Sequence, residues 1–419
     1  MLHSGPFVTK DIPGIGGRIK RYPEDFRVTE VLSRDRERPG LWALALVEKV
    51  NRTSFEMVQI LAHHLQIDQR AISLAGMKDT RAVTRQFVAL EGISRDAVRA
   101  VQLPYLHVLS VTTTDSPLRY GEHIGNRFDI RVREVDRSRE EALIAILDNL
   151  SRNGLPNFYG PQRFGSGYEG ALVGKGLLLG DHEAVVWRLL GWHGGRSNNQ
   201  CAEARRLFSK GDWASALRAW PRRWYEKRRM LDTLIETEGD FQASTKRIPS
   251  RLKRLYLMGY QSHIFNLCLT ARLEGYFRLL EGDIPSRDTG EEPCPTGPIF
   301  GPNMPLPSGM VLDLECRLLA EEGFSLKDLL YPSREGNWLH GSRRPFAVAL
   351  REVAYRWDGS DLLLHFMLPP GSYATVLLGE ITKIVYRAAY TTMVDPFIRG
   401  KGRFLGHQRP FPHQLPMDS

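Results

Sequence analysis

A lone carboxylate stands among basic and polar side chains near residue 80. The stretch reads GMKDTRAVTRQ over residues 76–86, and its Asp79 lies between Lys78 and Arg81. An ionised carboxylate can act as a nucleophile or accept a proton, and neither role needs a metal ion. The same residues also suit a plain tight turn, in which Gly76 and Asp79 shape the backbone and the two cations are solvated. The residues alone leave both interpretations open.

Short apolar runs on either side predict the elements that position this carboxylate. Residues 71–75 and 87–90 are apolar, β-prone and short enough to be strands. A polar loop between two strands is a common place for catalytic groups on a rigid scaffold. We therefore expect Asp79 on a loop between two neighbouring strands.

Five further segments have the character of motifs. They read EDF at residues 24–26, GNRF at 125–128, PNFYGPQRFG at 156–165, GSRRP at 341–345 and LPPGSYAT at 368–375. Together with the stretch around Asp79 they resemble, in the same order, the segments of the TruD family of tRNA pseudouridine synthases. The resemblance extends over most of the chain, and it implies that Asp79 is the family's nucleophilic aspartate.

The resemblance implies an isomerase that converts uridine to pseudouridine at position 13 of tRNA. This reaction breaks the N1–C1′ bond and joins C1′ to C5, so it needs neither redox change nor phosphoryl transfer. It does need a carboxylate that meets a nucleotide taken out of its stack. We expect no metal and no cofactor. Whether Asp79 attacks C6, attacks C1′ or first abstracts a ribose proton stays open.

The resemblance also implies substrate contacts at Phe26, Asn126, Phe128 and Tyr373. An aromatic face can stack on a flipped base for roughly 1–3 kcal/mol, and an amide can hydrogen-bond to base or sugar. The residue pattern alone has a simpler explanation for each. Phe26 and Phe128 have the parity of core residues, Asn126 suits a turn, and Tyr373 suits the first turn of a helix capped by Ser372.

Several cations lie on the motif segments. Lys20, Lys78 and Arg343 are candidate substrate contacts, and Arg21 and Arg344 stand beside two of them. Each alone is an ordinary solvated charge. As a group they predict a groove that binds phosphates.

The overall composition is that of a globular protein with excess positive charge. Of the 419 residues, 42% are hydrophobic and 25% are charged, and the formal net charge is +9. A chain of this length favours two domains. Lys and Arg neutralise phosphates, so the charge favours a polyanionic partner, which the motifs make tRNA. We expect a monomer.

The cysteines and the absence of long apolar runs indicate the compartment. None of the cysteines forms a C-x-x-C pair, which favours a reducing compartment and no metal site. No segment approaches the ~20 apolar residues that a membrane-spanning helix needs. We therefore expect a cytoplasmic protein without a membrane segment. The cysteines are Cys201, Cys268, Cys294 and Cys316.

The periodicity predicts an α+β fold with a mostly antiparallel, mixed sheet. Predicted strands occupy residues 20–32, 41–47, 105–112, 127–135, 346–353 and 362–368. Predicted helices occupy residues 53–65, 94–101, 138–150, 183–192, 202–208, 213–236 and 251–280, with another from about residue 372. A capping box at residues 138–141 is expected to open one helix. Residues 284–309, rich in Pro and Gly, are expected to be an irregular and mobile connection.

The resemblance implies a catalytic domain that is built from both ends of the chain. Its first part would be residues 1–155 and its second part residues 339–390. A helix-rich α/β family-specific domain, residues 156–338, would be inserted between them. Residues 391–419 would form a basic, aromatic and partly disordered tail.

One departure from the family pattern and two competing functions remain. Many family members carry Arg-Glu where this chain has Gly379-Glu380, so a charged partner of the active site could be missing. The first alternative function is an RNA-binding or RNA-folding protein that keeps the scaffold without catalysis, against which the intact Asp79 loop argues. The second is a metal-dependent nuclease, which needs clustered carboxylates that the sequence does not display.

Overall fold

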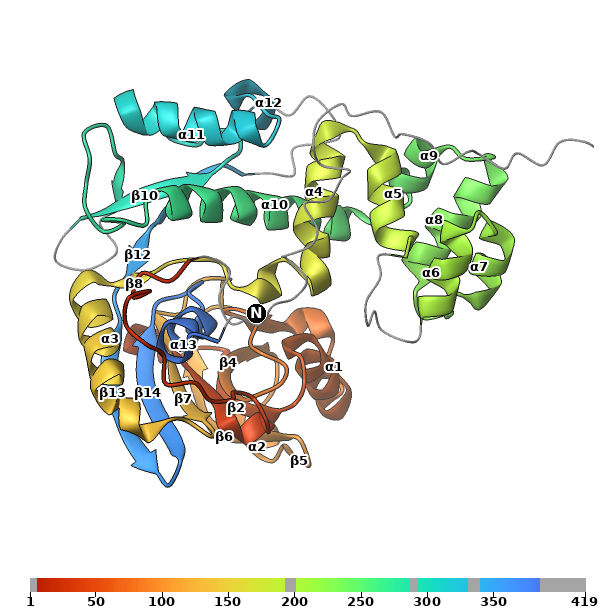
Figure 1. Cartoon of the computed structure of the whole chain (residues 1–419). Helices are drawn as coiled ribbons and strands as arrows, with labels where there is room; N and C mark the ends of the chain where they lie inside the picture. Colours follow the sequence, from red (N-terminus) through yellow and green to blue (C-terminus); the bar gives the residue numbers. More distant parts are fainter. Residues whose placement is uncertain (1–5, 193–200, 287–292, 331–339, 385–419) are drawn as a thin grey trace, which may run out of the picture. The chain divides into compact units, whose positions relative to one another are not determined.

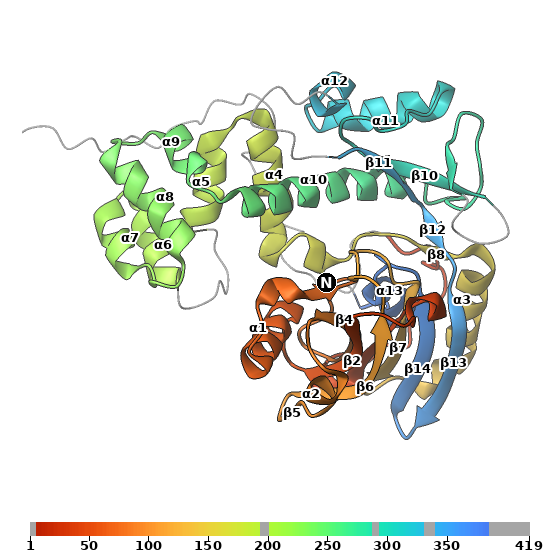
Figure 2. The ribbon, with the colours of Figure 1, turned by 180° about the vertical axis from the view of Figure 1, so that it is seen from behind.

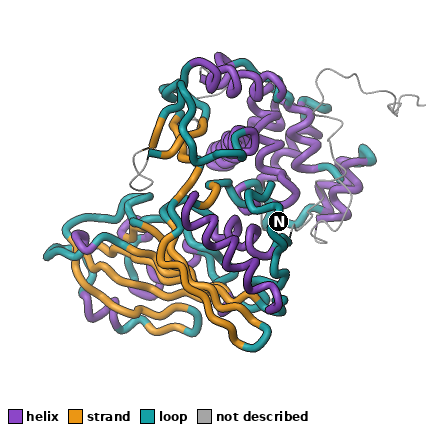
Figure 3. The backbone as a smooth tube through the Cα atoms, turned by 60° about the vertical axis from the view of Figure 1, so that its left-hand side comes forward, coloured by secondary structure: helices purple, strands orange, loops and turns teal. Residues whose placement is uncertain are grey.

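The computed structural model describes residues 6–192, 201–286, 293–330 and 340–384. The predicted tail at residues 391–419 lies outside these ranges, and so does the middle of the predicted connection at residues 284–309. Strands gather in one region of the described chain, and helices dominate the rest (Figure 3). This distribution agrees with the predicted α+β class.

Nine strands of the described residues form the main sheet (Figure 1). Across the sheet the order is β13 (Arg351–Asp358), β14 (Asp361–Leu368), β7 (Gly125–Val132), β1 (Phe26–Val31), β4 (Val83–Glu91), β2 (Trp42–Val50), β6 (Leu106–Thr114) and β5 (Gln102–Leu103). The ninth strand, β3 (Ile72–Leu74), pairs with β4.

Strands from both ends of the described chain meet in this sheet. β14 pairs antiparallel with β7, with Leu362 opposite Val132 and Leu368 opposite Asn126. Among the strand pairs of the described chain, β1 and β4 alone run parallel. The sheet is therefore mixed and mostly antiparallel, as predicted.

The strand predicted at residues 127–135 is present as β7, and its side chains alternate between a buried and an exposed face. Phe128, Ile130 and Val132 are buried. Arg127 and Asp129 point to the other face and are exposed. The buried face packs against helices α3 (Glu140–Asn153) and α13 (Ala374–Thr382) in one hydrophobic core. Figure 2 shows the same strands from behind. The period of two thus sets which face of the sheet is buried.

Helices of the N- and C-terminal parts lie with the sheet. They are α1 (Ser54–Leu65), α2 (Arg95–Arg99), α3 (Glu140–Asn153) and α13 (Ala374–Thr382). The remaining helices follow between residues 169 and 330. They are α4 (Glu169–Leu179), α5 (His182–Leu190), α6 (Ala202–Ser209), α7 (Trp213–Ala219), α8 (Tyr225–Glu236), α9 (Phe241–Lys246), α10 (Ser250–Ala271), α11 (Gly309–Glu321) and α12 (Leu326–Leu330).

Two smaller sheets complete the described chain. One holds β9 (Pro285–Ser286), β10 (Cys294–Ile299) and β11 (Ser342–Pro345), and the other pairs β8 (Leu155–Pro156) with β12 (Ala347–Val348). The prediction of irregular chain at residues 284–309 is therefore wrong for β10. Its Pro and Gly hid a strand whose residues are almost all buried, because burial can override low strand propensity.

Helix ends were predicted with mixed success. Thr53 caps α1, the helix predicted at residues 53–65, and forms a capping box with Glu56. The capping box expected at residues 138–141 is wrong, because a short 3₁₀ turn precedes α3 and Asp136, not Ser138, accepts the backbone hydrogen bond. Ser372 is likewise not the cap of α13; the cap position is Tyr373, and no side chain fills it.

The helical region differs from the prediction in two places. The predicted helix at residues 213–236 is two helices, α7 and α8, separated by a segment that contains Pro221. The structure also has α4, α9, α11 and α12, none of which the sequence predicted. Helices α5–α9 surround a hydrophobic core of their own, so apolar residues that look scattered in the sequence converge in space.

Candidate active site

The loop between β3 and β4 carries Asp79, as predicted, and a buried lysine holds its backbone. Lys49 of β2 is fully buried. Its Nζ donates to the carbonyl oxygen of Asp79 at 2.9 Å and to that of Arg52 at 2.7 Å. Burial lowers the pKa of Lys49 to about 8, with a further lowering from Lys78, while Asp79 and Glu56 oppose it. A buried cation thus anchors the residue that carries the reactive carboxylate.

Two buried polar side chains hold the rest of the loop. Ser54, the first residue of α1, accepts a hydrogen bond from the Lys78 backbone at 3.0 Å and donates to Gln86 Oε1 at 2.7 Å. Gln86 Nε2 donates to the carbonyl oxygen of Gly76 at 3.3 Å. Three elements, β2, α1 and β4, therefore fix the backbone of the loop at Asp79 and in the residues that precede it.

The carboxylate of Asp79 pairs with Lys20. Lys20 Nζ lies 2.9 Å from Asp79 Oδ1, and both side chains are partly exposed. The same ammonium lies 3.8 Å from the centre of the Phe26 ring. Arg81 donates to the Arg21 carbonyl oxygen at 3.2 Å, which ties the Lys20 segment to the loop. Lys20 has a φ of 54°, which is uncommon for a residue with a side chain and is frequent at functional sites.

Lys78 points away from solvent. Its ammonium forms a short contact with Glu30 of β1, and both side chains are buried. Glu30 also accepts from the Phe87 backbone at 2.8 Å. The structure therefore gives Lys78 a place inside the protein rather than on a phosphate groove, and its substrate contact stays a prediction.

The two phenylalanines predicted to meet the base lie in the core. Phe26 is 1% exposed and Phe128 is 5% exposed. Phe128 stacks on Phe366 at 5.1 Å between ring centres and meets Phe26 edge-on at 6.1 Å. A base can reach only the small exposed part of either ring in this arrangement. Both observations fit the core role, and the stacking role stays a prediction.

Asn126 stands two residues before Phe128 on β7. It is 8% exposed and lies opposite Glu30 of β1. Its neighbour His123 packs against Gly76, a residue of the loop that carries Asp79. Asn126 is therefore a strand residue beside the loop and not the turn residue that the Gly-Asn pair suggested.

Tyr373 contacts the segment of residues 156–165. Its ring lies 5.9 Å from that of Tyr159. Arg344 lies over Tyr159 at 4.2 Å, and Arg163 lies over it from 5.5 Å. Three motif segments far apart in the sequence thus meet around one aromatic ring, and the substrate contact of Tyr373 stays a prediction.

A basic pocket of about 410 Å³ opens beside this aromatic pair. Of the described residues, its lining includes four arginines and no carboxylate. Arg163 donates from Nε to Ser262 at 3.0 Å, which leaves its outer nitrogens for other partners, and Arg254 is exposed. The lining residues are Tyr159, Arg163, Arg254, Met258, Gln261, Ser262, Ile299, His340, Ser342, Arg343, Arg344 and Pro345.

Arg343 is less available than the prediction assumed. Its guanidinium forms a buried ion pair with Glu315 of α11 at 2.8 Å and also bonds Thr296. A buried pair of this kind is costly to break because it would leave a lone buried charge. The geometry favours a structural role for Arg343, while its substrate role stays a prediction.

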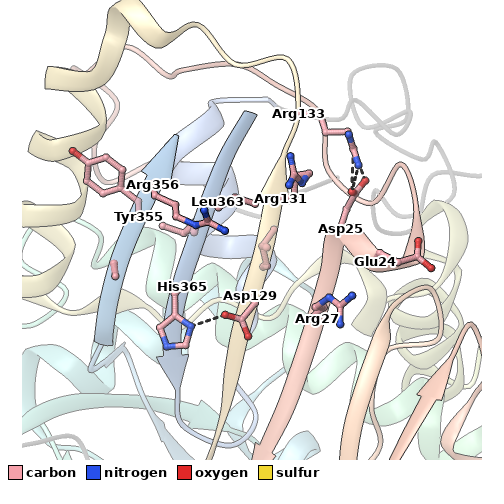
Figure 4. A pocket seen from close by; sticks show the side chains of 13 residues that line it. Glu24, Asp25, Arg27, Asp129, Arg131, Arg133, Tyr355, Arg356, Leu363 and His365 are labelled. Carbon is pink, nitrogen blue, oxygen red and sulfur yellow. Dashed lines mark hydrogen bonds and ion pairs between the residues drawn. The ribbon is translucent and has the colours of Figure 1, made fainter. Parts of the chain in front are cut away.

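A second groove, of about 440 Å³, lies on the outer face of the main sheet (Figure 4). Arg27, Asp129 and His365 project into it from β1, β7 and β14. His365 pairs with Asp129 at 2.7 Å. Arg27 alternates with Phe26, so this groove lies on the face opposite to the buried aromatic residues, and Asp79 is not among its lining residues.

Comparison with known proteins places this geometry in a family. The model of the family described as tRNA pseudouridine synthase D (TruD) matches residues 5–293 and 287–381. The chain belongs to the TruD family. A tRNA pseudouridine synthase D of Geotalea daltonii is 33% identical over 399 residues, covering 90% of this chain and 99% of the relative. One of Geobacter metallireducens is 34% identical over 398 residues, covering 90% and 97%.

A solved structure has the same fold. The crystal structure assigned to a tRNA pseudouridine synthase D (TruD) from Methanosarcina mazei matches with a TM-score of 0.74 and 28% identity. The match covers 91% of this chain and 97% of that one. The predicted fold class and the predicted family are therefore confirmed.

The departure from the TruD pattern at Gly379 does not leave Asp79 without a cation. Lys20 supplies the ion pair. Glu380 is fully buried and accepts from the backbone of Val8 at 2.8 Å and from the Thr9 hydroxyl at 2.6 Å. In this TruD-family chain the Gly-Glu position therefore ties the N-terminal segment to α13.

The described residues include neither a membrane-spanning helix nor a metal-binding cluster. No helix there is both long and apolar enough to span a bilayer. Within the same ranges, no three His, Cys, Asp or Glu side chains converge on a point where they could hold a metal ion.

Proposed function

We propose that this chain is a tRNA pseudouridine synthase that isomerises uridine 13 of tRNA, with Asp79 as the reactive carboxylate. The observation that carries the proposal is the Asp79–Lys20 pair on an anchored loop, in a chain that belongs to the TruD family. The backbone of the loop is fixed by buried hydrogen bonds. Such anchoring suits a group that must meet one atom of a flipped nucleotide.

The chemistry requires one bond to break and one to form. The N1–C1′ bond is cleaved, the base turns, C5 bonds to C1′, the C5 proton is lost and N1 gains a proton. Asp79 has one oxygen held by Lys20, which leaves the other oxygen for attack or for proton transfer. We propose that Lys20 orients the carboxylate and that no other side chain of the loop replaces it.

RNA binding is proposed for the basic pocket around Tyr159. Arg343 pairs with Glu315, but no carboxylate in the lining opposes the other three arginines, so phosphates can bind there and hold the RNA next to a displaced nucleotide. Tyr373 and Arg344 border the same region. Most of the residues that line the pocket belong to the predicted inserted domain. This domain would therefore bind the tRNA without contributing a catalytic group.

The division of the chain into domains is kept as a proposal. The main sheet supports it, because each of its strands lies before residue 133 or after residue 350. Limited proteolysis tests it. Cleavage between residues 156 and 338 should leave the fragments associated through β7 and β14, and fragments that separate under native conditions would contradict the division.

The proposed function is tested by Asp79→Asn in the full-length protein. Asn is nearly isosteric but neither nucleophilic nor basic, so tRNA binding should persist while pseudouridine formation at position 13 is lost. Asp11→Asn, at an exposed aspartate, is the matched control. Activity of Asp79→Asn within about tenfold of wild type would remove the residue from the chemistry, since loss of a nucleophile costs far more. Binding without product in the wild type would favour the non-catalytic alternative.

A further inference from the structure

A buried amide beside the Asp79 loop has an oxygen without a hydrogen-bond partner. Asn126 is 8% exposed, and among the described residues nothing donates to its Oδ1. Burial of an unpaired acceptor is unfavourable, so native structures keep few of them without a reason. A ligand that brings a donor to this position would remove the penalty.

His123 determines which way this amide faces. Its Nε2 lies 3.4 Å from Asn126 Nδ2. Its Nδ1 makes no hydrogen bond within the described residues, and Glu30 Oε1 lies 4.0 Å from it. The Ala75 backbone also interacts with the ring. We assign the proton to Nδ1, the ring nitrogen on the side of the Glu30 carboxylate, so that Nε2 keeps its lone pair and accepts from Asn126. Asn126 Oδ1 is therefore turned away from the ring.

The surroundings keep His123 neutral. Burial lowers the pKa of His123, and Lys78 lowers it further, while Glu30 and the Ala75 carbonyl oppose the shift. Glu30 is itself paired with Lys78. Because a neutral ring has one donor and one acceptor, its orientation dictates that of the amide.

This arrangement adjoins the reactive loop. His123 Cε1 lies 3.3 Å from the place that a Cβ on Gly76 would occupy. Gly76 stands three residues before Asp79 on the same loop. His123 therefore contacts both the Asp79 loop, through Gly76, and Asn126 of β7.

We propose that His123 is a positioning residue that orients Asn126 to accept the N3–H of the target uracil, and that this selects uracil over cytosine. Uracil presents N3–H as a donor between two carbonyl acceptors, whereas N3 of cytosine is an acceptor. Asn126 Oδ1 pairs with the first and repels the second. The remaining Nδ2 hydrogen is free for a uracil carbonyl. The inference rests on the proposed function, which supplies uridine as the target.

The test compares two target bases in two proteins. tRNA transcripts carry either uridine or 3-deazauridine, which has C–H in place of N3–H, at the modified position, and binding is measured with Asp79→Asn so that no turnover occurs. The deaza base should bind about tenfold more weakly, as expected for a buried acceptor that loses its donor. With His123→Phe added the difference should fall to about twofold or less, because the amide can then rotate.

Two further variants make the result specific. His123→Gln keeps an acceptor for Asn126 and should restore most of the preference for uridine, whereas His64→Phe, at an exposed histidine of α1, should change nothing. An unchanged preference in His123→Phe would overturn the proposal. So would equal binding of the two bases to the protein that retains His123.

A measurement on the unaltered side chain covers the case in which His123→Phe fails to fold. Nitrogen-15 NMR of the wild-type imidazole should show the proton on Nδ1, and the Nε2–H tautomer would overturn the proposal. Acid should also raise the KM for tRNA below the ordinary histidine pKa, since protonation of Nε2 turns the acceptor into a donor. If the wild type forms no pseudouridine, the proposed function fails, while the tautomer and the base preference still decide the role of His123.

Discussion

Replacement of Lys49 by methionine should separate the stability of the protein from its activity. Methionine keeps the length of the buried side chain and removes the ammonium that holds the carbonyl oxygens of Asp79 and Arg52. The loop then loses the anchor closest to its carboxylate, although its other two anchors remain. We expect a folded protein in which Asp79 is poorly placed.

Two opposing effects determine how much Lys49→Met changes the free energy of unfolding. The pKa of Lys49 is lowered from 10.5 to about 8, so keeping the buried side chain charged costs about 3 kcal/mol, and Lys49→Met removes that cost. The two hydrogen bonds from the cation are worth about 1.5–3 kcal/mol each and are lost. The free energy of unfolding should therefore fall by only about 0–3 kcal/mol. Activity should fall much further, because a shift of about 1 Å at a reactive group can cost about a hundredfold in rate.

The assay pairs thermal or denaturant unfolding with single-turnover pseudouridine formation on a tRNA transcript. Lys210→Met, at an exposed lysine, is the matched control and should leave both readouts unchanged. The reasoning is refuted if Lys49→Met retains a rate within about threefold of wild type, since the anchor would then not position the carboxylate. A collapse of stability beyond about 5 kcal/mol would refute the balance of the two terms.

Three other outcomes are expected. Lys20→Met should lower the single-turnover rate by about tenfold to a hundredfold with tRNA affinity nearly unchanged, because it removes one charge-assisted hydrogen bond to Asp79. Arg163→Gln should weaken tRNA binding and reduce the dependence of the affinity on salt, whereas Arg27→Gln in the outer groove should do neither. Equal effects of the two substitutions would contradict the assignment of RNA binding to the basic pocket. Burial alone would raise the pKa of Glu322, but hydrogen bonds from His263 and Lys175 hold it at about 2. The ionised Glu322 therefore contributes about 3 kcal/mol to the free energy of unfolding above pH 4.5, and this contribution is lost as the pH falls toward 2. The stability of Glu322→Gln, measured against pH, should lack this acid-dependent loss.

Part of the site follows from strand periodicity. Glu30 shares the parity of Phe26 and Val28, and Lys49 shares that of Val47, so both charged side chains are placed on buried faces by the alternation alone. A charge on a buried face needs a partner, and this rule would have pointed to both residues. In the sequence analysis, parity assigns faces to residues 26–29 and 127–135 but is not applied to Glu30 or Lys49.

Other features required the three-dimensional structure. His123 lies in a loop, where no strand or helix periodicity indicates which side chains are buried. Its role depends on neighbours contributed by β1 and by the Asp79 loop. Arg343 and Arg344 are adjacent in sequence, yet one pairs with Glu315 and the other lies over Tyr159. Their difference depends on α11 and on the segment at residues 156–165, whose positions no local pattern specifies. Propensity likewise failed for β10, where burial outweighed Pro and Gly.

The long sequence separation between the paired strands β7 and β14 has a consequence for synthesis on the ribosome. β7 ends at Val132, and its partner β14 begins at Asp361, more than 200 residues later. At about 5–20 residues per second, the growing chain leaves this side of β7 without a partner for about 10–45 seconds. An unpaired strand edge invites association with other chains, and charged side chains discourage it. Arg127, Asp129 and Arg131 of β7 are charged side chains of this kind, and they are in place before β14 is synthesised.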